Sequence, residues 1–104
     1  MTSYLAIHGI RDTARKARYD QLQPGDRIAE PRTDHRGTVT FQTFTQAAVA
    51  IAKGKIAIVR STGSLPDGTI VLGLEYPPTR GIVPVDVPAT IATTRTLIDP
   101  EDGE

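Results

Sequence analysis

A run of apolar residues at every second position restricts the fold of this chain more than any other feature. Ile70, Leu72, Leu74 and Tyr76 have this spacing within residues 69–76. Successive side chains of a β-strand point to opposite faces, so the spacing predicts a strand with one buried face.

A second strand is predicted just upstream. Residues 55–60 (Lys-Ile-Ala-Ile-Val-Arg) carry apolar side chains on both faces, which is typical of a strand inside a sheet. Residues 61–68 between the two strands are dense in turn formers, and Pro66, Asp67 and Gly68 favour a tight reversal. We therefore expect an antiparallel hairpin.

Three further extended segments are expected: one upstream of this hairpin, at residues 37–44, and two downstream of it, at residues 81–88 and 90–98. Pro84 and Pro88 have no N–H to give to a ladder, so the middle segment must lie at a sheet edge or be kinked. Only residues 45–54 are ambiguous. Their alanines favour a short helix with Thr45 as N-cap and Gly54 at its end, and a strand turning into residues 55–59 is the alternative.

The predicted fold class is mainly β: a small SH3-like or related barrel or sandwich of five to six strands with at most one short helix. Fourteen threonines, nine glycines and eight prolines in 104 residues support many short strands. We divide the chain into an N-terminal segment (1–18, basic at 11–18), one β-rich domain (19–98) and an acidic tail (99–104). The expected core residues are Val39, Phe41, Ile58, Leu72, Leu74, Val85 and Val87.

One segment resembles a known family. Residues 24–28 (Pro-Gly-Asp-Arg-Ile), followed by residues 37–39 (Gly-Thr-Val), are similar to the opening of SH3-like barrels of the KOW type. In this interpretation Pro-Gly makes a turn, Asp26 caps it, Ile28 enters the core and Gly37 lets the backbone fold back. The resemblance implies a small barrel and nucleic-acid binding, as in several ribosomal proteins and transcription factors.

Catalytic and metal-binding patterns are sparse. The chain has no cysteine, which excludes disulfides, thiolate metal sites and cysteine nucleophiles. His8 and His35 are its only histidines, and Asp34 beside His35 is too small a ligand set for a metal. No glycine-rich phosphate loop or nucleophile elbow is present. We predict no enzyme activity, no cofactor and no metal.

The net charge of zero hides an uneven distribution, because basic residues gather near the N-terminus and the last six residues hold four carboxylates. Basic clusters can contact phosphates or carboxylates of a partner. The candidate contact residues for a protein or nucleic-acid partner are Arg11, Arg15, Lys16, Arg18, Arg32, His35 and Arg36.

These features predict a small interaction or adaptor module that binds another protein through loops or an exposed strand edge, such as a phage or accessory protein acting on a host or virion component. The alternative is a KOW-like nucleic-acid-binding domain that uses the basic segment. The basic residues follow the apolar stretch near the N-terminus instead of preceding it, which is the reverse of a secretory signal, and the longest apolar run, residues 47–52, is too short for a membrane span. We therefore expect a cytoplasmic protein without membrane contact.

Overall fold

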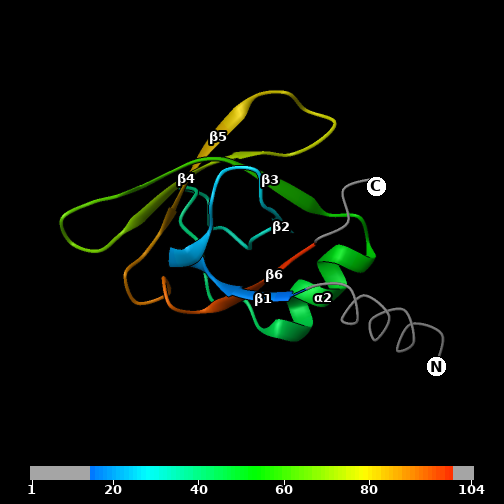
Figure 1. Ribbon diagram of the computed structural model, residues 1–104, viewed down its shortest axis with the longest axis horizontal. Helices are drawn as coiled ribbons and strands as arrows, with labels where there is room; N and C mark the ends of the chain where they lie inside the picture. Colours follow the sequence, from blue (N-terminus) through cyan, green and yellow to red (C-terminus); the bar gives the residue numbers. More distant parts are fainter. Residues whose placement is uncertain (1–14, 100–104) are drawn as a thin grey trace.

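The computed structural model describes residues 15–99, which form one six-stranded antiparallel sheet and a short α-helix (Figure 1). The strand order is β1-β6-β2-β3-β4-β5, and the sheet is not closed. The predicted mainly β fold class is confirmed. In chain order the elements are β1 (Arg15–Arg18), η1 (Tyr19–Gln21), β2 (Arg27–Ala29), α2 (Phe44–Ala52), β3 (Ile56–Ser64), β4 (Ile70–Glu75), β5 (Ile82–Val87) and β6 (Arg95–Ile98).

The main core lies on one face of this sheet. All six strands contribute buried residues to a single cluster, from Ala17 of β1 to Val87 of β5. Tyr19, 0% exposed, packs in the same cluster.

Most of the predicted core is confirmed: Val39, Leu72, Leu74, Val85 and Val87 are buried. Two members differ. Ile58 is only half-buried, because Ala57 and Val59 face the main core instead. Phe41 is 60% exposed, so its assignment to the core was wrong.

The predicted hairpin is confirmed, with a longer first strand than expected. β3 continues to Ser64 opposite Ile70, and a bulge between Val59 and Ser61 shifts its register. The assignment of residues 61–64 to the turn was wrong, because ladder bonds to β4 hold these small residues extended. The reversal itself needs only the last four residues, with Gly68 at φ +94°. Figure 1 shows this hairpin projecting beyond the rest of the sheet.

The strand predicted at residues 37–44 is wrong. Its residues form only two isolated bridges, one to Thr33 and one to Asp86 of β5. Gly37, at φ +83°, turns the chain back, and the following residues lead directly into the helix cap. In the segment 90–98 only residues 95–98 form a strand, because residues 89–94 are occupied by turns.

The helical alternative for residues 45–54 is confirmed. The cap is Thr43 rather than Thr45: the Gln46 N–H donates to Thr43 Oγ1, and the Gln46 side chain accepts from the Thr43 N–H. This reciprocal capping box explains why the helix begins at Phe44. Gly54, at φ +76°, follows its last turn as predicted. Alanines of α2 pack on the outer face of β2 and β6 against Ala29 and Leu97.

The turn that leads into β2 has the geometry expected from residues 24–28. Gly25 has φ +98°, and the Asp26 carboxylate accepts from the Gln23 N–H at 2.9 Å. Ile28 is fully buried. The side-chain cap and the glycine together fix the entry into the short strand β2.

Candidate functional site

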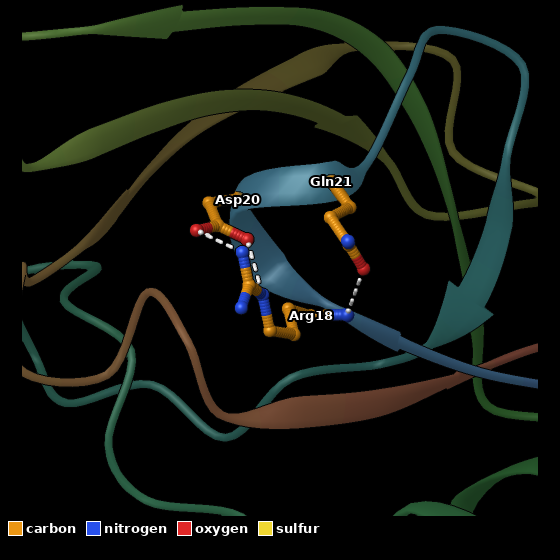
Figure 2. A network of polar contacts seen from close by, with 3 residues as sticks. All are labelled: Arg18, Asp20 and Gln21. Carbon is orange, nitrogen blue, oxygen red and sulfur yellow. Dashed lines mark hydrogen bonds and ion pairs between the residues drawn. The ribbon is translucent and has the colours of Figure 1, made fainter.

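Of the predicted contact residues, Arg15, Lys16 and Arg18 lie together on β1, and all three are exposed. The Lys16 Nζ lies 4.9 Å from the centroid of the Phe44 ring. Figure 2 shows Arg18 paired with Asp20, its Nε 3.0 Å from Oδ1. Arg18 also lies opposite Arg95 of β6. Arg11 lies outside the described residues.

The other predicted contact residues lie in the loop between β2 and α2. Arg32 lines a surface hollow beside the helix, while His35 and Arg36 are exposed in the following turn. Asp34 Oδ1 accepts from the N–H groups of Thr38 and Arg36, at 3.0 and 2.8 Å, which lowers the pKa of Asp34. Within residues 15–99 no hydrogen bond or ion pair joins this loop to β1, so the predicted residues form two groups.

Free strand edges are one feature of this fold to which another chain could bind. An edge strand presents unpaired N–H and C=O groups to which another chain can add as a further strand. Because these groups alternate in direction along a strand, known hydrogen bonds show which residues face outward. β1, β5 and the distal part of β3 each have such an edge.

The outer edge of β1 is occupied at one position. The Tyr19 N–H donates to the Thr94 carbonyl on the β6 side, so Lys16 and Arg18 face outward. The Arg18 N–H, however, donates to Oε1 of Gln21 at 3.2 Å (Figure 2). The carboxamide of Gln21 therefore takes the place of a neighbouring strand at this position.

The outer edge of β5 is also obstructed. The Asp86 N–H donates to the Gly37 carbonyl at 3.0 Å, and its carbonyl accepts from the Val39 N–H at 2.7 Å. Alternation then places Pro84 outward as well, and proline has no N–H to offer. The prediction that Pro84 marks an edge strand is confirmed, and this residue also limits pairing along that edge.

The distal part of β3 is open. Pairing toward β2 ends at Val59, whose N–H donates to the Asp26 carbonyl at 2.9 Å. Beyond the bulge, the Leu65 N–H bonds the Thr69 carbonyl at 2.8 Å, so Leu65 faces β4. By alternation Thr62 and Ser64 turn their N–H and C=O groups to the side that β2 leaves empty. Both residues are exposed.

A cavity of about 220 Å³ lies beside this open edge. One wall is the hairpin itself, and the other is the chain between β1 and β2. The residues that line it are Tyr19, Asp20, Leu22, Thr62, Gly63, Ser64 and Ile70.

The far wall of this cavity is rigidly held. The Tyr19 hydroxyl donates to Gln42 Oε1 at 3.1 Å, and burial raises the pKa of Tyr19. Asp20 is bound through both carboxylate oxygens by the Arg18 guanidinium (Figure 2). The negative charge of Asp20 at the rim of the cavity is therefore balanced by Arg18, which suits an uncharged side chain in the cavity.

The edge and the cavity together have the properties of a β-strand acceptor. An added strand could form four backbone hydrogen bonds, one with the N–H and one with the C=O of each of Thr62 and Ser64. The cavity could accommodate one of its side chains. Among residues 15–99 no three His, Asp or Glu side chains are grouped as metal ligands. Within the same range, no helix is long and apolar enough to cross a membrane.

Sequence reasoning missed Thr62 and Ser64 because it assigned them to the turn. A signal was nevertheless present. Pro66, Asp67 and Gly68 alone are sufficient for a reversal, so the preceding residues are free to pair with the start of the next strand. Comparison with protein-family models, with curated proteins and with solved structures found no match.

Proposed function

We propose that this protein is a non-enzymatic interaction module that binds an extended segment of another protein by strand addition to β3. The observation that supports this function is the open edge at Thr62 and Ser64 beside a cavity. Strand addition supplies affinity through main-chain hydrogen bonds and specificity through pockets for alternate side chains.

The geometry limits the affinity. Each backbone hydrogen bond contributes about 0.5–1.5 kcal/mol, and burial of one aliphatic side chain contributes about 1.5–3 kcal/mol. Association costs at least about 4 kcal/mol in lost translational and rotational freedom. At the upper end of these contributions the net is about 5 kcal/mol, so a short peptide should bind no more tightly than a Kd of about 0.2 mM. A module of this strength serves a partner whose segment is already held nearby.

The test uses two substitutions at one position. Ser64→Pro removes the outward N–H and leaves the ladder to β4 intact, because residue 64 does not donate toward β4. Ser64→Ala keeps the N–H and removes only the hydroxyl. The probe is the acetylated peptide Lys-Thr-Val-Thr-Val-Thr-Lys, titrated into 15N-labelled protein.

We expect the Ser64→Pro variant to bind the peptide about tenfold more weakly, since one hydrogen bond is lost and a peptide carbonyl is left unpaired. The Ser64→Ala variant should bind like the wild type. Equal affinities of all three proteins, or shifts centred on β1 or β5, would refute the proposal.

Nucleic-acid binding is a second candidate function, and the exposed basic residues of β1 support it. Arg15 and Lys16 are exposed and belong to none of the ion pairs among the described residues. Duplex-DNA affinity is measured over a salt series that starts at about 50 mM. Arg15→Gln should reduce the magnitude of the slope of log K against log salt concentration by about one. Arg80→Gln, in the β4–β5 loop, is the control. Absence of binding to DNA and RNA would exclude this function.

A further inference from the structure

A second hollow lies just after the end of β2, whereas the open part of β3 lies beyond the turn that leads into β2. It is an open depression of about 300 Å³, bordered by the last turns of α2, the chain that follows β2 and the residue that precedes β3. This volume is at the lower end of the range for small-molecule sites. The hollow shares no lining residue with the cavity at Thr62 and Ser64.

Three cations surround the hollow: Arg32, Lys53 and Lys55. The ion pairs among residues 15–99 involve Arg18, Arg27 and Arg60, so the three cations of the hollow have no carboxylate partner there. Glu30 is the single carboxylate in the lining. The hollow therefore carries a surplus of about two positive charges, which an incoming dianion would balance.

The inner wall contributes a buried hydrogen-bond donor. Gln42 is 2% exposed, and its Nε2 donates to the Glu30 carbonyl at 3.0 Å. Its Oε1 accepts from the Tyr19 hydroxyl at 3.1 Å. Because a backbone carbonyl cannot donate, these bonds fix the orientation of the amide. The second hydrogen on Nε2 has no acceptor among the described residues, and it belongs to a residue that lines the hollow.

We propose that this hollow binds the phosphate monoester of a small polyhydroxy compound. A phosphate monoester carries about −1.5 to −2 charges at pH 7, which matches the cationic surplus, and its oxygens accept hydrogen bonds from Lys, Arg and the Gln42 amide. Glu30 accepts from hydroxyl groups of the ligand body. Pro31, buried, and Ala50 give the carbon chain an apolar surface.

Two ligands distinguish phosphate recognition from hydroxyl recognition. Inorganic phosphate tests the first alone, and glycerol 3-phosphate adds two hydroxyl groups. Binding is followed by amide chemical shifts of the full 15N-labelled chain. Both ligands should shift the amides of residues 30–32, 42 and 53–55, and glycerol 3-phosphate should bind more tightly. Glycerol alone should cause no shift.

Three variants test the roles of the residues. Lys55→Gln should weaken the binding of both phosphate ligands about two- to fivefold, the size expected for the loss of one exposed charge contact. Arg80→Gln removes the same charge elsewhere and should leave both affinities unchanged. Glu30→Gln should strengthen the binding of inorganic phosphate by relieving repulsion, and should reduce the preference for glycerol 3-phosphate, because an amide oxygen is a weaker acceptor than a carboxylate.

Several results would overturn the proposal. Equal weakening by Lys55→Gln and Arg80→Gln would show that only the net charge of the protein attracts phosphate. Absence of saturable binding at about 10 mM ligand, with all variants folded by their amide spectra, would show that the hollow is only a solvated basic surface. Weaker binding of inorganic phosphate to Glu30→Gln would contradict the role given to Glu30.

Discussion

At the scale of single residues, two tyrosines show how this small core accommodates polar groups. Tyr19 is fully buried, and its hydroxyl donates to Gln42, which in turn donates to the backbone of residue 30. A buried hydroxyl without a partner would cost about 1–3 kcal/mol, so this chain of bonds makes an internal tyrosine acceptable. It also connects the wall of the β3 cavity with the wall of the cationic hollow.

Tyr76 gives the stability of the protein a pH dependence. Burial, followed by the nearby charge of Glu30, raises the pKa of Tyr76 to about 12. A group whose pKa is higher in the folded state stabilises that state below its unfolded pKa of about 10, and the contribution is lost as the pH rises toward 12. We expect the free energy of unfolding to fall by up to about 2 kcal/mol across this range.

Denaturant unfolding between pH 9 and about pH 12 checks this prediction. Tyr76→Phe has no hydroxyl to ionise, so its stability should depend less steeply on pH than that of the wild type. Identical slopes for the two proteins would show that Tyr76 titrates as it does in the unfolded chain.

At the scale of secondary-structure elements, local pattern predicted some parts of the fold and failed at others for physical reasons. β4 and β5 were found because apolar residues alternate along them and Pro84 marks an edge. The helix was placed by its alanines, while its start depended on the capping box of Thr43 and Gln46. The strand predicted at 37–44 is absent because Gly37 turns the chain, so its β-branched residues never gain a ladder.

The contact between neighbouring strands at Gly73 provides a test at this scale. A Cβ at residue 73 would lie 2.5 Å from Ser61 Oγ and 3.0 Å from Ile82 Cγ2. Gly73→Ala should therefore overpack this face and destabilise the protein by about 1–3 kcal/mol. Removal of the Ser61 side chain in the same protein should recover part of that loss.

Chemical denaturation of the two single variants and the double variant measures this coupling. Additive effects of Gly73→Ala and Ser61→Gly would mean that the side chains do not meet and that the register across the bulge is different.

At the scale of the whole molecule, the candidate site depends on where strands end. β2 contains only three residues, whereas β3 contains nine, so the far part of β3 extends beyond its neighbour. No local sequence pattern reports this difference in length, because it arises from pairing between segments far apart in the chain. The basic residues proposed from the sequence could be recognised without the fold, and the structure distributes those within residues 15–99 over β1 and the loop after β2.

Amide hydrogen exchange at Thr62 and Ser64 tests the central claim most directly. In the free protein these two amides should exchange fast, while the alternate amides of Ser61 and Gly63, bonded to β4, should be protected. Saturation with the strand-forming peptide should slow exchange at Thr62 and Ser64 and leave their neighbours nearly unchanged. Protection of Thr62 and Ser64 in the free protein, or no added protection with the peptide bound, would contradict strand addition to β3.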